Sequence, residues 1–121
     1  MMYHKLLPLF VFLFSLTACE PPTANEPPTG QATIPPLIYT KHARCRMDCR
    51  KVDESEVVEI LQQNNINHKK SKTSDKPCPS FAYEGISHDN QYLRIVVAKC
   101  EQNWKVVTCI DLETDYSCSC Y

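Results

Sequence analysis

The stretch from Lys41 to Lys51 concentrates reactive side chains, with one histidine, two cysteines and three arginines in eleven residues. Thr40 can cap a helix there by accepting a hydrogen bond from a first-turn backbone N–H. At 100° per residue, one arc of that helix carries His42, Cys45, Arg46, Cys49 and Arg50. An imidazole beside guanidinium groups can bind a phosphate or carboxylate and can move a proton. We therefore expect an anion-binding or acid–base face, with a solvated basic helix as the alternative.

Seven cysteines lie beyond residue 36: Cys45, Cys49, Cys78, Cys100, Cys109, Cys118 and Cys120. Two on one helical turn suit metal binding, and the two tail cysteines could complete a four-thiolate zinc site. In an exported chain, however, this density of cysteine indicates disulfides. We favour disulfides, with no metal and no other cofactor, and expect the tail to be tied back to the first helix. Seven is odd, so one thiol stays free or pairs between chains.

Periodicity predicts the elements that position these residues. A capping box of Asp53 and Glu56 predicts a second helix to about Gln63, with Glu56 on its solvent side. Strands are expected at Ile66–Ser71, Phe81–Ile86, Tyr92–Cys100 and Trp104–Leu112. The predicted fold class is α+β: two N-terminal helices followed by an antiparallel four-stranded meander, stapled by disulfides.

Alternation divides the last two strands into two faces. The apolar face, expected under the helices, carries Leu93, Ile95, Val97, Trp104, Val106, Thr108 and Ile110. The opposite, mixed face carries Arg94, Val96, Ala98, Cys100, Lys105, Val107, Cys109 and Asp111. A β-bulge would invert this assignment beyond the point where it occurs.

The first helix resembles a known family, through the run His42-Ala43-Arg44-Cys45-Arg46-Met47, followed by Arg50, Val52 and the acidic second helix. This pattern resembles the domain of unknown function 4258 family. Three later segments are also similar to that family: Tyr83-Glu84-Gly85, Leu93-Arg94-Ile95-Val96 and Val106-Val107-Thr108. The resemblance spans nearly the whole domain, and the added cysteines look like an exported, lipoprotein branch.

The activity of that family is not established, but its plan is similar to the barnase/RelE-like ribonuclease fold. That likeness implies that His42 is an acid–base group and that Arg46, Arg50 and Arg94 hold a scissile phosphate. The formal net charge of the chain is only -1, which argues against nucleic acid as a partner. We therefore lean against an enzyme.

The N-terminus reads as a lipoprotein signal. Residues 1–18 hold one lysine and a short apolar run, too short to span a bilayer. Leu16-Thr17-Ala18-Cys19 resembles a bacterial lipobox, which implies that Cys19 is acylated and that membrane lipid is a partner. Residues 19–36 form a proline-rich linker, and 37–121 form one small domain.

These observations predict a lipid-anchored module of the bacterial cell envelope, with the outer membrane favoured over the inner. The module is expected to bind an envelope protein or an anionic ligand through His42, Arg46 and Arg50. A ribonuclease-like hydrolase using the same face, or a purely structural lipoprotein, are the alternatives.

Overall fold

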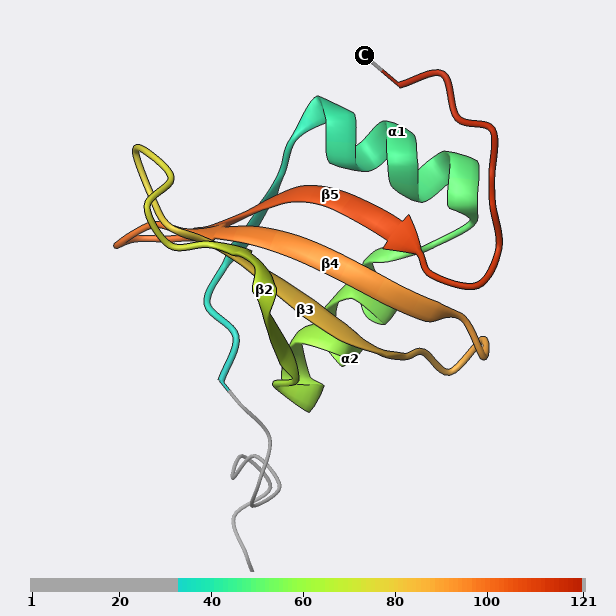
Figure 1. Cartoon of the computed structure of the whole chain (residues 1–121), viewed down its shortest axis with the longest axis horizontal. Coiled ribbons are helices and arrows are strands. Elements are labelled where there is room, and N and C mark those ends of the chain that lie inside the picture. The colour runs from blue at the N-terminus through green and yellow to red at the C-terminus, as the bar shows by residue number, and fades with distance from the viewer. Residues whose placement is uncertain (1–32, 121) are drawn as a thin grey trace, which may run out of the picture.

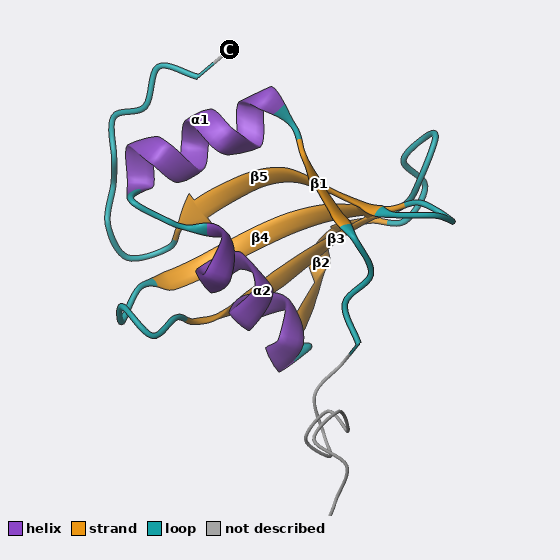
Figure 2. Ribbon diagram, turned by 180° about the vertical axis from the view of Figure 1, so that it is seen from behind, coloured by secondary structure: helices purple, strands orange, loops and turns teal. Residues whose placement is uncertain are grey.

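A computed structural model describes residues 33–120. Five strands form one sheet, and both helices pack on one face of it, as Figures 1 and 2 show from opposite sides. The expected signal peptide, Cys19 and most of the linker lie outside the described residues. The elements are β1 (Leu37–Tyr39), α1 (Lys41–Arg50), α2 (Glu54–Gln63), β2 (Ile66–Lys72), β3 (Ser80–Ile86), β4 (Tyr92–Lys99) and β5 (Trp104–Asp111).

The α+β prediction is confirmed, but the sheet has five strands and is mixed. Its order is β1-β5-β4-β3-β2, in which the last four strands form the expected antiparallel meander. The additional strand, β1, pairs in parallel with β5, placing Leu37 opposite Trp104 and Tyr39 opposite Val106. Three residues are too few for alternation to reveal a strand, so this element was absent from the sequence prediction.

Capping explains where both helices begin. The Thr40 side chain accepts from the backbone N–H of Ala43 at 3.0 Å, which starts α1 as expected. At α2 the Asp53 side chain accepts from the Glu56 backbone, and the Glu56 carboxylate accepts from the Asp53 backbone, each at 2.9 Å. Both expected caps are therefore present, and each helix starts at a fixed residue.

The core lies between the helices and the sheet. Its fully buried members include Ala43 of α1, Val57, Ile60 and Leu61 of α2, and the β4 residues Leu93, Ile95 and Val97. Glu56 was expected in solvent, but it is 1 % exposed and accepts a hydrogen bond from the Ser87 hydroxyl at 2.8 Å. The capping hydrogen bond turns the Glu56 carboxylate inward, because the first turn of α2 is itself packed against the sheet.

A β-bulge corrects the predicted faces of β5. Val97 pairs with Val106 and Val96 pairs with Thr108, so Val107 is the extra residue. Beyond it the side chains change face: Cys109 is fully buried in the core, whereas Thr108 and Ile110 are only half-buried. The sequence prediction had these three residues reversed, which is the inversion that a bulge causes.

Three disulfides connect the chain: Cys45–Cys120, Cys49–Cys118 and Cys78–Cys100. The first two tie the tail to α1, which was the preferred pairing, and they leave no four-thiolate set for zinc. The seventh cysteine, Cys109, is free and buried, and burial raises the pKa of its thiol to about 12.

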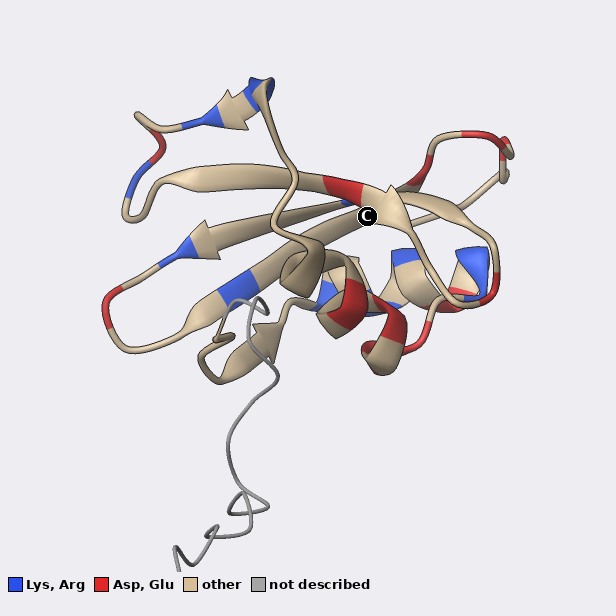
Figure 3. Cartoon of the chain, turned by 90° about the horizontal axis from the view of Figure 1, so that it is seen from below, with Lys and Arg blue, Asp and Glu red and all other residues tan. Residues whose placement is uncertain are grey.

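Within residues 33–120, neither helix has the length and apolar character needed to cross a membrane. Acidic residues lie in the loops at both ends of the sheet, as Figure 3 shows.

Candidate anion-binding site on the first helix

Helix α1 packs beside the edge of β5 that β1 leaves unpaired. β1 pairs with β5 only as far as Val106. Beyond it, the Thr40 hydroxyl donates to the carbonyl of Val107 at 3.2 Å, and Arg50 Nη1 donates to the carbonyl of Cys109 at 2.8 Å. Side chains from both ends of α1 thus satisfy the open edge of β5 and hold the helix in one orientation.

Arg50 is therefore a structural residue, which corrects its expected place on the anion-binding face. It is only 8 % exposed, and one of its nitrogens is committed to the Cys109 carbonyl. The helical arc predicted from the sequence is correct, but this residue lies at its inner margin beside the buried Ala43 and Met47. A helical wheel does not reveal which margin of an arc meets a strand edge.

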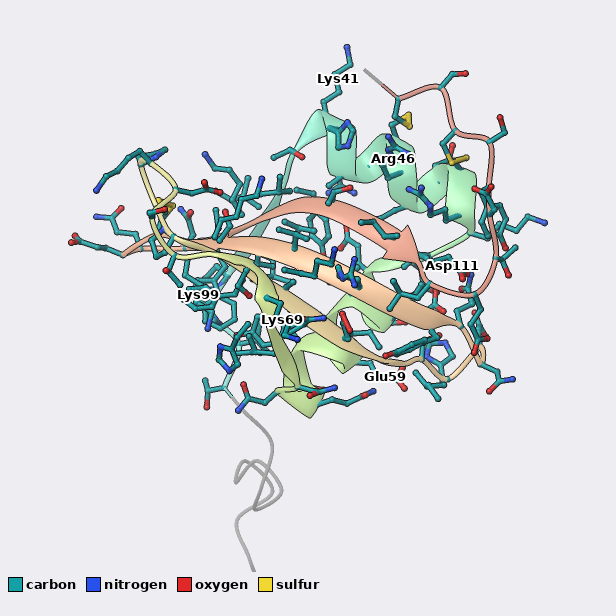
Figure 4. The ribbon with its side chains drawn as sticks, viewed as in Figure 1. Lys41, Arg46, Glu59, Lys69, Lys99 and Asp111 are labelled. Carbon is teal, nitrogen blue, oxygen red and sulfur yellow. A yellow bond between two sulfur atoms is a disulfide. The ribbon has the colours of Figure 1, made fainter. Side chains whose placement is uncertain are left out.

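His42 and Arg46 occupy the outer part of the same flank, one helical turn apart. Both are half-buried, and the imidazole has no hydrogen bond within residues 33–120. Nε of Arg46 is buried without a hydrogen-bond partner, and no carboxylate of the described residues lies within 4.0 Å of its guanidinium. Figure 4 shows Arg46 on α1 above β5. An uncompensated guanidinium beside an imidazole is suited to an anion.

The opposite flank of α1 carries a neutralised arginine. Arg44 Nη1 lies 2.9 Å from Glu54 Oε1, and its guanidinium stacks 4.7 Å from the centre of the Tyr39 ring. Burial of that ring, with Glu54 nearby, raises the pKa of Tyr39 to about 12. A shallow groove of about 610 Å³ runs here between α1 and the start of α2. Basic and acidic side chains both line this groove. It is therefore less suited to binding an anion than the flank of α1 that carries His42 and Arg46.

Arg94, the fourth predicted residue, is already paired. It lies on the sheet face opposite the helices, where Nε donates to Glu84 Oε2 at 3.0 Å. The two side chains are 18 % and 10 % exposed, and Asn67 donates to both carboxylate oxygens of Glu84. Of the three arginines proposed to hold a phosphate, one is thus bound to a backbone carbonyl and one to a carboxylate. Arg46 has no carboxylate partner and no hydrogen bond within the described residues, so it is the arginine of the three that is free to bind a ligand.

A different group of side chains comes closest to a metal-ligand set in residues 33–120. Asp53, His88 and Asp89 place their ligand atoms within 4.8 Å of one another, but all three are exposed. His88 Nδ1 lies 2.6 Å from Glu59 Oε2, and this hydrogen bond raises the pKa of His88. Exposed acidic groups of this kind are common without an ion, so we assign no metal here.

Comparison with known proteins identifies the domain. The family described as domain of unknown function DUF4258 matches residues 39–111, from the last residue of β1 through both helices to the end of β5. The match leaves out Cys118 and Cys120, so both tail disulfides reach beyond it. Neither the curated proteins nor the solved structures include a match. Because the matched residues are more than half of the chain, the protein belongs to the DUF4258 family.

Proposed function

We propose that this protein is a lipid-anchored module of the bacterial cell envelope that binds an anionic group on the His42/Arg46 flank of α1. The observation that carries the proposal is the state of Arg46, a half-buried residue with a buried, unpartnered Nε and no carboxylate within 4.0 Å; Arg50 shares both features but is buried and donates to a backbone carbonyl. A buried donor without a partner costs about 1–3 kcal/mol, and a bound anion would remove that cost. His42 would add a second donor from the preceding turn.

The cysteines support the proposed compartment. Three disulfides persist in an oxidising environment and are rare in the reducing bacterial cytosol. This supports an extracytoplasmic location. We propose that the protein is an exported, cysteine-rich lipoprotein of its family. We propose Cys19 as the lipidated residue, with the outer membrane favoured.

The anchor is tested separately from the ligand. Cys19→Ala should abolish labelling with a radioactive fatty acid and release the protein from the membrane fraction. Cys109→Ala is the matched control, because this buried free cysteine should not affect lipidation. Persistent fatty-acid labelling of the Cys19 variant would show that the anchor lies elsewhere.

The ligand class is tested by calorimetric titration of the full chain with inorganic phosphate, sulfate, acetate and a short RNA. Removing a charge-assisted contact is worth roughly 1.5–3 kcal/mol, so Arg46→Ala should weaken phosphate binding by about 10- to 150-fold. His42→Ala should weaken it less. Arg44→Ala, on the other flank, should bind phosphate as the wild type does.

The same titration addresses the alternatives. A distant likeness to barnase/RelE-like ribonucleases would make His42 an acid–base group, so wild type would cleave the RNA and His42→Ala would lower turnover by about 10²- to 10⁴-fold. We expect no cleavage, because residues 37–121 carry equal numbers of basic and acidic side chains and two of the three arginines are already paired. A purely structural lipoprotein would bind none of the four ligands.

A further inference from the structure

Three aromatic rings surround one ammonium group at the end of the sheet. Nζ of Lys99 lies 4.5 Å from the ring centre of Phe81, 4.5 Å from that of Trp104 and 5.1 Å from that of Tyr83. The rings come from β3 and β5, and Lys99 ends β4 between them. Tyr83 and Trp104 are themselves 6.3 Å apart and tilted by 33°. This arrangement is an aromatic cage, and a lysine of the same chain fills it.

No opposite charge holds Lys99 in the cage. Within the described residues no carboxylate lies within 4.0 Å of its ammonium, and no hydrogen bond of that ammonium is found. Its attraction to the rings is therefore the electrostatic interaction of a cation with their π faces. Because the side chain is unbranched and otherwise unattached, it can leave the cage by rotation about its own bonds.

The sheet and the core hold the three rings of the cage in place. Tyr83 is 1 % exposed, so its ring is covered while Lys99 is in place. Phe81 and Trp104 are half-buried and pack against the core. Trp104 is further fixed by its strand, since its backbone N–H donates to the carbonyl of Pro36 at 3.1 Å. Figure 4 shows Lys99 beside the segment through which the chain enters the domain.

We propose that the Phe81/Tyr83/Trp104 cage is a binding site for a quaternary ammonium group, such as that of choline, and that Lys99 is its displaceable resident cation. A primary ammonium is strongly hydrated and loses that hydration on entering a ring of aromatics. A quaternary ammonium is weakly hydrated and carries its charge on methyl groups that fit aromatic faces. Aromatic cages recognise such groups in many proteins. The external ligand would therefore replace the lysine, because a quaternary ammonium loses less hydration than a primary ammonium when it enters the cage.

The chain provides its own probe for this site, because Trp104 is the only tryptophan in the sequence. The full chain, in a non-ionic detergent, is titrated with tetramethylammonium and with choline while tryptophan emission is recorded. Wild type should show a saturable change. Lys99→Ala should lower the apparent Kd by about tenfold or more, because the competing cation is gone. Lys105→Ala removes an exposed lysine of the same hairpin and should bind as wild type does.

Two further arms define the chemistry. The neutral isostere 3,3-dimethylbutanol has the shape of choline without its charge, and it should bind Lys99→Ala much more weakly than choline does. Vesicles of phosphatidylcholine, compared with free choline, separate a lipid headgroup from a soluble ligand. Phe81→Leu removes one ring, leaves Trp104 as the reporter and should weaken binding in both backgrounds.

Absence of a saturable change in both wild type and a folded Lys99→Ala variant would overturn the proposal. Equal binding of choline and its neutral isostere would also overturn it, since the cage would then be only an apolar cavity. If Lys99→Ala does not fold, the comparison of wild type with Phe81→Leu decides: equal choline affinity in those two proteins would exclude the cage as the site.

Discussion

Four arginines of this domain have four different surroundings, and those surroundings decide what each can do. Arg44 is paired with Glu54 at the surface, and Arg94 is paired with Glu84 on the sheet. Arg50 is buried and bound to a backbone carbonyl. Among the described residues, neither Arg46 nor Arg50 has an acidic partner, but Arg46 is the more exposed of the two and makes no hydrogen bond to the backbone, which is why it is the proposed anion-binding residue.

The structural role of Arg50 predicts a loss of stability without a loss of binding. Arg50→Ala removes the hydrogen bond to Cys109 and exposes the edge of β5, and should lower the free energy of unfolding by about 2–3 kcal/mol. Urea denaturation measures this. Arg44→Ala, which breaks an exposed ion pair, should cost no more than about 1 kcal/mol. If Arg50→Ala were as stable as the wild type, the structural role assigned to Arg50 would be wrong.

Cys109 should be chemically silent in the folded protein. Burial raises the pKa of its thiol to about 12, and the thiolate, rather than the thiol, is the reactive form. A thiol reagent should therefore label no cysteine of the native, unreduced domain and one cysteine after denaturation. Mass spectrometry of the labelled peptide identifies the site. Rapid labelling of the native domain, or more than one labelled cysteine after denaturation, would contradict this pairing.

Residue-level prediction from the sequence succeeded where local spacing was enough. The one-turn spacing of His42 and Arg46 placed both on one flank, and helical geometry alone supports that. The burial of Arg50 depends on an edge of β5 distant in sequence, and the cage around Lys99 needs the register of three strands. No local pattern contains that information.

At the scale of elements, the sequence analysis predicted neither the short strand β1 nor the position of the bulge in β5. β1 has three residues, and its partner is the last strand of the domain. The bulge at Val107 leaves the apolar character of β5 unchanged, so alternation predicted the faces correctly before it and wrongly after it. The sequence predicted that the tail is tied to α1. Which tail cysteine bonds to which cysteine of the helix depends on how the tail packs along α1.

One of the contacts between the β3–β4 turn and α2 is made by the His88 side chain, and this contact should depend on pH. Glu59 accepts a hydrogen bond from His88 and raises the pKa of that imidazole; Asp89 and Glu56 act in the same direction, and desolvation opposes them. The charged form is favoured in the folded state. Its stabilisation is therefore complete below the unfolded pKa of about 6.5 and is lost as pH rises through the folded value.

His88→Ala should consequently destabilise the domain more at pH 5 than at pH 9. Free energies of unfolding of both proteins, measured across that range, test this. His68→Ala, which removes an exposed histidine of β2, serves as the control. A penalty for His88→Ala that grows toward high pH would reverse the sign of the proposed linkage.

For the whole molecule, the two tail disulfides form a nested pair. Cys45–Cys120 closes a separation of 75 residues and Cys49–Cys118 one of 69. Either bridge alone would raise the free energy of the unfolded chain by roughly 4 kcal/mol in the loop-entropy treatment, because it removes conformational entropy from that state. Once one is formed, the other closes only a small ring, because its cysteines are near neighbours of the first pair.

The two bridges should therefore be strongly non-additive. Replacing Cys49 and Cys118 together by serine should cost well under half of the stability lost when all four cysteines are replaced. Thermal and urea unfolding of the three proteins provides the comparison. Equal losses for each bridge, adding up to the total, would mean that the nested loops do not share their entropy. A small domain of this size needs such cross-links.

The anion-binding flank and the entry of the chain lie on different sides of the domain. Figure 1 shows α1 and the tail at one side and residues 33–36 entering at the other.

The most direct test of the central proposal is the phosphate affinity of Arg46→Ala relative to Arg44→Ala, measured by calorimetry on proteins of equal thermal stability. The two substitutions remove the same charge from the same helix, on opposite flanks. The uncompensated state of Arg46 predicts at least tenfold weaker binding for Arg46→Ala and unchanged binding for Arg44→Ala. Equal affinities in the two variants, or no binding by wild type, would contradict the proposed anion site.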